Sequence, residues 1–501
     1  MLFHALSACL TFASPLLAQE ITEIYDIWQT TWDRSGLFTY TNLYPNPIPW
    51  NTPGTAGSAD IVITDGTVYQ NIVGFGAALT DSSAQLLSQL KSTNSDNYWD
   101  ILNYLFDPTD GADAAGFSYL RVPLGASDFS ASVYSFDDVS GDTSLDSFDI
   151  NNAPSYLFEV LSDIAGINNL LKIHIVPWSP PGWMKDSGTM LGGSFLSQYT
   201  DTFASYLLKC LQGFQSQGFS IWAIGVQNEP QNSDTTYPTC LISAAQEAAI
   251  GLQLRTLMDD NGFSDTIIIG YEHNWNDAGA YPVQLMEDAA SAFYGVSFHC
   301  YEGSVSDQET FYNAYPDKAI FFTECTGEIG SDWWSDIKWY MDNIFIGSPN
   351  YWGQSGAMWN LVLNGLGQPL LPGTDSCGTP CRGVVTVNSN GTYNYNQEFY
   401  AIAQASKAIL PKDVGGPFGQ RIEVAVNGDL NWGLIVGAYV TNRVSSSDWP
   451  RYSLVVLNWD DTPNGSWDPQ DITTTIEFRG YQATYTFPVG VTTIYWYAEP
   501  N

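Results

Sequence analysis

The order of apolar and polar positions changes character near residue 411. Before that point, short apolar runs alternate with stretches of helical periodicity, and we expect helices at residues 82–90, 195–214, 244–258 and 400–410. Strands that alternate with helices predict parallel βαβ units, and eight such units form a closed (β/α)8 barrel. Eight apolar runs can be counted, which begin near Gly74, Phe117, Leu171, Ile221, Thr266, Gly295, Ala319 and Ala357.

After residue 411 the helical periodicity is lost. Strands separated by Asp, Asn, Gly and Ser turns are expected at residues 422–426, 434–441, 452–458, 473–478 and 485–497. This pattern predicts an attached all-β domain, most simply a sandwich. Residues 19–72 contain two further short strands, at 59–63 and 68–72, that could contribute to it. We therefore divide the chain into N-terminal strands (19–72), an α/β barrel (73–411) and a C-terminal β-sandwich (412–501), packed together.

Two of the expected barrel strands end on a glutamate. The apolar stretch that begins at Ile221 ends on Asn228 and Glu229, before Pro230 stops the strand. The stretch 319–324 ends on Glu324. Barrel enzymes place their catalytic residues at the C-terminal ends of the strands. A glutamate that merely starts a loop explains a lone Asn-Glu-Pro equally well, so the hypothesis depends on both glutamates together.

Two facing carboxylates are what glycoside hydrolysis needs. One protonates the leaving oxygen and the other attacks the anomeric carbon, so their surroundings must push the two pKa values apart. Arg121 lies inside an apolar run, and a buried guanidinium requires an anionic partner. One of the glutamates could be that partner, with a purely structural ion pair as the alternative. Tyr301 could donate a hydrogen bond to the same carboxylate.

Tryptophans at successive strand ends could supply flat apolar surfaces for sugar rings. A single tryptophan is more often part of the core, but several at neighbouring strand ends favour a binding surface. Asp81, by contrast, stands where it could simply cap the helix at 82–90. The four tryptophans are Trp178, Trp183, Trp275 and Trp359.

Other chemistries fit the sequence less well. The chain has no Gly-x-Ser-x-Gly elbow, Walker loop, dinucleotide fingerprint or His-Glu-x-x-His motif. His174 lies in mid-strand, where we expect it to pack or bond locally. His273 and His299 end different strands, and a zinc site from these two and a carboxylate is conceivable, but known zinc ligand patterns do not favour it. We therefore expect no metal and no cofactor.

Composition and charge narrow the classes of partner. The 501 residues are 44% hydrophobic and 14% aromatic, which is typical of a globular protein. The formal net charge is −37 with only 16 Lys and Arg, the wrong sign for binding nucleic acid or an anionic membrane. The charge suits a neutral or cationic partner, although the acids could equally serve only to keep an exported protein soluble.

Several features indicate export. Residues 1–18 have the pattern of a secretory signal peptide, and Asn390 and Asn464 stand in N-glycosylation motifs. We therefore expect a secreted, extracellular protein, and a monomer, although nothing in the sequence bears on oligomeric state. The mature chain keeps an even set of cysteines that is compatible with disulfides. Cys377 and Cys381 could close a small ring, whereas we expect free buried thiols at Cys300 and Cys325.

Several motifs together resemble glycoside hydrolase family 30, a group of retaining β-glycosidases that includes glucosylceramidases and endo-β-1,6-glucanases. The motifs occur at residues 74–84, 121–130, 178–185, 227–230, 299–301, 322–324 and 359–361. The resemblance implies a (β/α)8 barrel with a side sandwich built from both chain ends. It implies Glu229 as the acid/base and Glu324 as the nucleophile. It also implies sugar contacts from Asp81, Trp178 and Asn228, in a pocket lined by Arg121, His299, Tyr301 and Trp359.

The loop after the last motif departs from glucosylceramidases. Residues 364–373, followed by Cys377 to Arg382, form a different sequence at the place that bounds the substrate cleft. We therefore expect a secreted enzyme that acts on a neutral β-glucan, best described as an endo-β-1,6-glucanase. A β-1,6-galactanase, a xylanase or a glucosylceramidase are the alternatives within the family, and a non-catalytic carbohydrate-binding protein is the alternative of another class.

Overall fold

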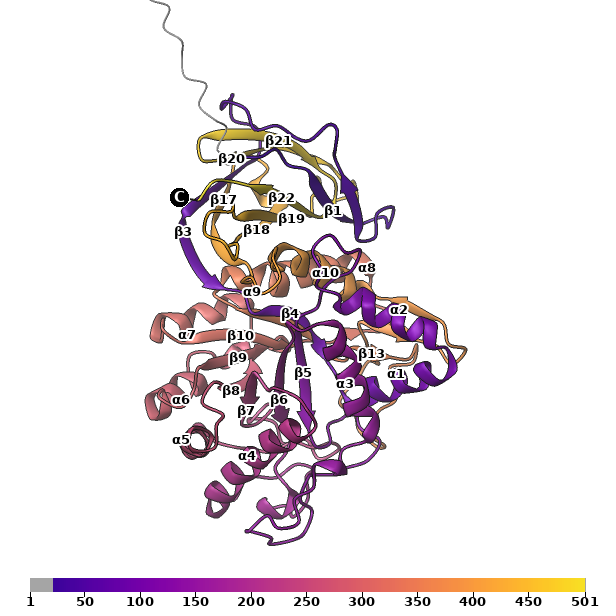
Figure 1. The fold of residues 1–501 in the computed structure, drawn as a ribbon, viewed down its shortest axis with the longest axis vertical. Coiled ribbons are helices and arrows are strands. Elements are labelled where there is room, and N and C mark those ends of the chain that lie inside the picture. The colour runs from indigo at the N-terminus through magenta and orange to yellow at the C-terminus, as the bar shows by residue number, and fades with distance from the viewer. Residues whose placement is uncertain (1–20, 501) are drawn as a thin grey trace, which may run out of the picture.

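The computed structural model describes residues 21–500 (Figure 1), so the expected signal peptide lies outside the described residues. A barrel with helices around it fills the lower part of the view, and a β-rich part lies above it. Helix α10 (Gln397–Ile409) lies between the two. The α/β barrel with attached β-strands is the fold class that the sequence predicts.

The barrel is an eight-stranded parallel sheet in the order β10-β9-β8-β7-β6-β5-β4-β12. It closes between its end strands, because Ser355 Oγ donates to the carbonyl of Phe322 at 3.1 Å and accepts from its amide at 3.2 Å. The eight predicted strands are therefore confirmed. They are β4 (Gly74–Ala78), β5 (Tyr119–Leu124), β6 (Lys172–Pro177), β7 (Ala223–Gly225), β8 (Ile267–Asn274), β9 (Gly295–His299), β10 (Ala319–Glu324) and β12 (Ser355–Met358).

The helices around the barrel bury one face each. In α3 (Ser155–Ile167) the buried residues are Leu157, Val160, Leu161 and Ile164, the spacing of a single helical stripe. The other principal helices are α1 (Asp81–Thr93), α2 (Ser95–Phe106), α4 (Thr200–Ser216), α5 (Ala244–Asp260), α6 (Tyr281–Ala289), α7 (Gln308–Ala314), α8 (Trp333–Tyr340) and α9 (Gly347–Asn350).

The cap of α1 differs from the sequence prediction. Thr80, not Asp81, is the N-cap, and its side chain accepts from the amide of Ser83 at 3.1 Å. Asp81 is the first helical residue instead. A threonine at this position satisfies one of the free amides of the first turn, which leaves the Asp81 carboxylate available for other contacts.

The β-rich part is a nine-stranded sheet built from both ends of the chain, in the order β2-β1-β22-β19-β18-β17-β3-β20-β21. Residues 59–72, predicted as two strands, form one long strand, and residues 485–497, predicted as one strand, form parts of two. The strands are β1 (Asp26–Thr31), β2 (Thr39–Asn42), β3 (Asp60–Asn71), β17 (Gln420–Asn427), β18 (Leu434–Thr441), β19 (Arg451–Asn458), β20 (Ile472–Phe478), β21 (Tyr481–Phe487) and β22 (Gly490–Tyr497).

This sheet folds back on itself around a second core. The ring of Phe478 in β20 lies 4.8 Å from that of Tyr452 in β19 and 5.3 Å from that of Trp496 in β22. Strands that are not neighbours in the hydrogen-bonded order therefore face each other across an apolar interior, as in a sandwich. The sheet also bonds to α10, where Ser453 Oγ donates to the carbonyl of Ala408 and Thr493 Oγ1 donates to Gln404.

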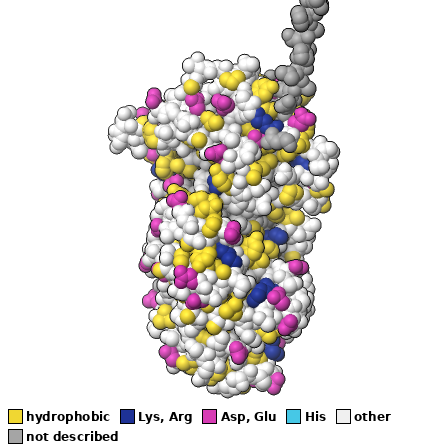
Figure 2. All heavy atoms as spheres, turned by 90° about the vertical axis from the view of Figure 1, so that its left-hand side faces the viewer, with side chains coloured by type: hydrophobic (Ala, Val, Ile, Leu, Met, Phe, Trp, Pro, Cys, Tyr) yellow, Lys and Arg dark blue, Asp and Glu magenta, His cyan; other side chains and the backbone are white. Residues whose placement is uncertain are grey.

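The surface reflects the acidic composition. Figure 2 shows Asp and Glu side chains scattered over one face, with few Lys or Arg among them. Asn390 and Asn464, the two predicted glycosylation sites, are both exposed. Among residues 21–500, no helix has the length and apolar character needed to cross a membrane.

Candidate active site

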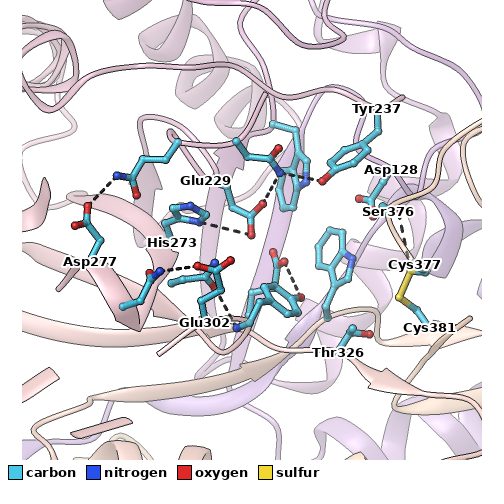
Figure 3. A pocket seen from close by; sticks show the side chains of 18 residues that line it. Asp128, Glu229, Tyr237, His273, Asp277, Glu302, Thr326, Ser376, Cys377 and Cys381 are labelled. Carbon is cyan, nitrogen blue, oxygen red and sulfur yellow. Dashed lines mark hydrogen bonds and ion pairs between the residues drawn. A yellow bond between two sulfur atoms is a disulfide. The ribbon is translucent and has the colours of Figure 1, made fainter. Parts of the chain in front are cut away.

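A cleft of about 680 Å³ opens beside the ends of several barrel strands (Figure 3). Glu229, from the loop after β7, and Glu324, the last residue of β10, both line it. The loop that follows the last barrel strand contributes Ser376, Cys377 and Cys381, so it bounds the cleft as the sequence predicts. The remaining lining residues are Asp128, Trp178, Gln231, Asn232, Tyr237, His273, Asn274, Asn276, Asp277, Tyr301, Glu302, Thr326 and Trp359.

The two glutamates lie close to each other. Nδ1 of His299 is 3.1 Å from Oε1 of Glu229 and 4.0 Å from Oε1 of Glu324. The two carboxylate oxygens are therefore no more than about 7 Å apart, a limit that includes the ~5–5.5 Å between the carboxyl groups of retaining glycosidases. The structure thus brings together the pair that the sequence singled out.

Glu324 is surrounded by hydrogen-bond donors. Its Oε2 accepts from Arg121 Nη1 at 2.5 Å, and its Oε1 accepts from the hydroxyl of Tyr301 at 3.0 Å. Desolvation, followed by the charges of Glu324 and Glu229, raises the pKa of Tyr301 well above its usual value, so this hydroxyl keeps its proton. Both oxygens of Glu324 therefore have a donor, which fixes the orientation of this carboxylate beside the cleft.

Arg121 has two anionic partners, where the sequence led us to expect at least one. Its side chain is fully buried, and besides Glu324 it binds Oε2 of Glu272 at 2.9 Å. Burial opposes the positive charge, but Glu272 and Glu324 raise the pKa of Arg121 above its ordinary value. Its Nη2 also donates to Oδ1 of Asn228 at 2.6 Å, which fixes that amide so that its NH2 group remains for another partner.

Glu272 is a site residue that the sequence reasoning missed. Burial alone would raise its pKa, but His174 and Arg121 outweigh burial and lower the pKa of this carboxyl to about 2. His174 Nε2 lies 2.8 Å from it, which is the local bond expected for that histidine. A bulge in β8 turns Glu272 inward, and a side chain at Gly225 would come within 2.7 Å of its carboxylate. The signal was available, because Glu272 also follows a buried apolar run.

Replacing Arg121 by methionine is expected to lower the free energy of unfolding by about 3–5 kcal/mol, because the buried carboxylates of Glu272 and Glu324 would lose the cation that they share. Activity should fall as well, because Glu324 loses its closest donor. Adding Glu272→Gln to Arg121→Met should recover part of the stability but none of the activity. Urea denaturation and steady-state rates measure the two effects. Wild-type stability in Arg121→Met would show that Glu272 is not held as a buried ion.

Glu229 has a different environment. Its Oε2 accepts from Asn232 Nδ2 at 2.9 Å, and its Oε1 faces His299 at 3.1 Å and His273 at 3.8 Å. Burial alone would raise the pKa of Glu229, but the two imidazoles outweigh burial and hold it well below its usual value. The two cleft glutamates thus differ in their partners, with a guanidinium and a phenol on one and imidazoles and an amide on the other.

Two of the four candidate tryptophans line the cleft. Trp178 and Trp359 stack on each other with ring centroids 4.9 Å apart. Trp275 is instead buried in the core, where its Nε1 donates to Gln308, and Trp183 packs against Tyr199 outside the cleft. The expectation of a four-tryptophan surface was therefore wrong, since two of the rings face the barrel's outer layers.

Asp81, a candidate sugar contact, is buried. The Asp81 carboxylate accepts from the hydroxyls of Ser130 and Tyr134, and the residue is not among those that line the cleft. Asp128, from the same β5 loop as Ser130, does line it and has one carboxylate oxygen with no hydrogen-bond partner. Burial raises the pKa of Asp128 to about 7. The geometry therefore favours Asp128 over Asp81 for a direct contact to a bound hydroxyl.

Disulfides support the strand ends that carry the site. Cys300 and Cys325 form a disulfide, so the expectation of free thiols there was wrong. This bond joins the residue before Tyr301 to the residue after Glu324, which ties the donor to its acceptor. Cys377 and Cys381 also form a disulfide, as predicted, in the loop that bounds the cleft. Cys210 and Cys240 are free thiols in the described part of the chain.

One group of side chains among residues 21–500 is close enough to hold a metal ion. It consists of Glu229, His273 and His299, whose ligand atoms all lie within 4.8 Å of one another. His273 and His299 are the two histidines for which the sequence pattern did not favour a zinc site. The carboxylate that completes the group is a cleft glutamate.

A (β/α)8 barrel whose strand ends bring two glutamates and two stacked tryptophans to one cleft has the architecture of a glycoside hydrolase. Residues 72–409 match the profile of the Glycosyl hydrolase family 30 TIM-barrel domain. The chain therefore belongs to glycoside hydrolase family 30. It is a glycoside hydrolase with the retaining mechanism that is general in this family.

Characterised relatives agree with this assignment. The chain is 33% identical over 382 residues to an endo-1,6-beta-D-glucanase of Trichoderma harzianum, covering 72% of this chain and 73% of the relative. It is 34% identical over 378 residues to an endo-1,6-beta-D-glucanase of Neurospora crassa, covering 71% and 74%. The solved structure of an endo-beta1,6-glucanase superposes with a TM-score of 0.79 at 25% identity, covering 95% of this chain and 100% of that chain.

Proposed function

We propose that this protein is a secreted endo-β-1,6-glucanase, with Glu324 as the nucleophile and Glu229 as the general acid/base. In the first step, Glu324 attacks the anomeric carbon while protonated Glu229 gives its proton to the leaving oxygen, and a glycosyl-enzyme forms. In the second step, ionised Glu229 takes a proton from water, which attacks the same carbon and releases Glu324. The two displacements together retain the configuration.

The main observation behind this proposal is that Glu229 and Glu324 both lie close to the imidazole of His299. In addition, each oxygen of Glu324 accepts a hydrogen bond. Arg121 and Tyr301 hold the nucleophile in position through these hydrogen bonds. The amide of Asn228, fixed by Arg121, is left to bond the 2-hydroxyl, a contact that strengthens in the transition state. Trp178 and Trp359 give part of the cleft wall an apolar character, with only a small part of each side chain exposed.

The choice of a β-1,6-glucan rests on the activities of the relatives and on the chemistry of the cleft. Two relatives above 30% identity and one solved structure are endo-β-1,6-glucanases. Asp128, Asp277 and Glu302 line the cleft, which does not suit an anionic, uronate-bearing chain. Free hydroxyls of a neutral glucan, by contrast, can donate to these carboxylates.

Release of sugar from a panel of polysaccharides tests the substrate. Purified protein should release a series of oligosaccharides from pustulan, a β-1,6-glucan, and much less from galactan, xylan or glucosylceramide. Release of glucose alone would replace endo by exo action. Preferential hydrolysis of another member of the panel would replace the substrate. Binding to pustulan without any hydrolysis of the panel would favour a non-catalytic carbohydrate-binding protein.

Secretion is part of the proposal. The sequence supports it through the signal-peptide pattern at residues 1–18 and the glycosylation motifs, whose Asn390 and Asn464 are exposed. Expression of the full chain in a eukaryotic secretion host should place the protein in the medium. Treatment with an endoglycosidase should then lower its mass. Retention inside the cells with residues 1–18 still attached would contradict export.

The pH dependence of kcat/KM should change when His273 is replaced. Glu229 must carry a proton when the first step begins, so kcat/KM falls as the pH rises through the pKa of Glu229. Because this pKa is lowered, the fall occurs at a lower pH than it would for an ordinary glutamate. His273→Gln removes one imidazole that favours the ionised form, so the pKa of Glu229 rises and the alkaline limb moves to higher pH. Profiles of kcat/KM in buffers that contain EDTA measure this. A limb that stays in place, or moves to lower pH, would contradict it.

A further inference from the structure

Three side chains from separate strand ends converge beside the cleft. Glu229 follows β7, His273 belongs to β8 and His299 ends β9. Figure 3 shows the ring of His273 turned toward the Glu229 carboxylate. Nδ1 of His299 lies 3.1 Å and Nδ1 of His273 lies 3.8 Å from the same oxygen, Oε1 of Glu229. Two imidazole nitrogens and one carboxylate oxygen therefore surround a single point.

These distances match a tetrahedral metal site. Zinc binds nitrogen and oxygen at about 2.0–2.1 Å, so two ligand atoms at a tetrahedral angle are roughly 3.3–3.4 Å apart. The two separations from Glu229, 3.1 and 3.8 Å, bracket that value. The third separation, between the two imidazole nitrogens, is no more than 4.8 Å, so the tetrahedral value requires these side chains to move by up to about 1.4 Å. A set of two histidines and one glutamate with a fourth, open position is a common zinc ligand set.

One of the histidines has coordination capacity that the protein does not use. Nδ1 of His273 is buried and has no hydrogen-bond partner, whereas Nδ1 of His299 already contacts Oε1 of Glu229 at 3.1 Å. Buried nitrogens without partners are costly, and a metal ion that takes a lone pair removes that cost for His273. The cleft opens the fourth position to water. Its acidic lining, which includes Asp128, Asp277 and Glu302, raises the local concentration of cations.

We propose that Glu229, His273 and His299 bind a zinc-like divalent cation that reversibly inhibits the enzyme. The oxygen that coordinates the ion, Oε1 of Glu229, belongs to the carboxylate that carries the proton in the proposed reaction. An occupied site leaves Glu229 unable to donate that proton, so hydrolysis stops until the ion dissociates. Only the inhibition rests on the proposed function, because binding of the ion requires the three ligands alone.

Metal binding can be measured without any substrate. Titration of the purified chain, first treated with EDTA, with cobalt chloride should give one equivalent of bound ion and the visible absorption of tetrahedral Co²⁺. Zinc chloride should displace it. His273→Gln and Glu229→Gln should each weaken binding by at least about tenfold, the lower end of what even supporting residues of metal sites contribute. Glu328→Gln is the matched control, because Glu328 is an exposed carboxylate that neither belongs to the three ligands nor lines the cleft.

Inhibition is measured on pustulan, with each variant normalised to its own activity without metal. Millimolar zinc chloride should inhibit the wild type, and excess EDTA should restore activity. Magnesium chloride should have little effect, because Mg²⁺ prefers oxygen ligands. His273→Gln should require at least about ten times more zinc for the same inhibition, whereas Glu328→Gln should behave as the wild type.

Each outcome separates the two proposals. Cobalt binding that depends on His273, in a protein without activity on pustulan, keeps the metal site and rejects the proposed function. An active enzyme that millimolar zinc does not inhibit overturns the metal site and leaves the function standing. Cobalt binding that is equal in the wild type, His273→Gln and Glu229→Gln places the ion elsewhere and also overturns it.

Discussion

Replacing Glu324 by glutamine is expected to lower kcat on pustulan by on the order of 10⁴–10⁶-fold, the loss that follows removal of a covalent nucleophile in a cooperating site. A neutral amide cannot attack the anomeric carbon, and Arg121 and Tyr301 would face a group without the charge that they stabilise. Initial rates on pustulan measure the effect. Thermal unfolding should show that the fold remains.

Glu328→Gln is the matched control for this substitution. Glu328 follows four residues later on the same segment, is exposed and does not line the cleft, so its replacement should leave kcat within a factor of about two, as for surface changes away from special features. A second experiment adds azide to the Glu324→Ala variant with an activated aryl β-gentiobioside as the substrate, and determines the configuration of the product. Azide would attack from the face that Glu324 vacates, so the sugar azide should have inverted configuration. Near-normal activity of Glu324→Gln would show that another group is the nucleophile.

Replacing Glu229 by glutamine should lower kcat on pustulan by on the order of 10²–10⁴-fold, the usual contribution of a general acid/base. The loss should depend on the leaving group, because only a poor leaving oxygen needs a proton. An activated aryl glycoside should form the glycosyl-enzyme at a rate near that of the wild type and then hydrolyse slowly. A burst of released phenol followed by a slow phase measures both steps.

Two comparisons make the Glu229 result specific. Glu302→Gln removes another carboxylate of the same cleft and should show no burst. Azide added to Glu229→Ala should accelerate the second step and give a sugar azide of retained configuration, the opposite of the Glu324→Ala product. An equal loss of activity on pustulan and on the activated glycoside, without a burst, would contradict the acid/base role.

The candidate site was recoverable from the sequence only in part. Glu229 and Glu324 were recognisable because each ends an apolar run, and in a parallel barrel all such ends meet at one face. Arg121 was recognisable because a charge within an apolar run demands a partner. Glu272 also follows a buried apolar run, but its direction depends on a bulge in β8 that the run does not predict.

The aromatic and cysteine predictions failed for a related reason. Trp178 and Trp275 both follow barrel strands, yet one faces the cleft and the other is buried against Gln308. Cys300 and Cys325 are 25 residues apart and form a disulfide because β9 and β10 are neighbours with aligned ends. Side-chain direction at a loop depends on contacts with distant segments, which the local sequence does not contain.

For this protein the sequence alone determined the barrel, the attached β-strands and the two principal carboxylates. It could do so because hydrophobic periodicity and strand order are properties of neighbouring residues, and strand ends of a parallel barrel have one possible location. The tertiary structure decided which donors each carboxylate receives. The pairing of Arg121 with both Glu272 and Glu324, and the convergence of His273 and His299 on Glu229, depend on strand register and on the bulge in β8. Those contacts join residues up to 203 positions apart, so they exist only after the barrel has closed.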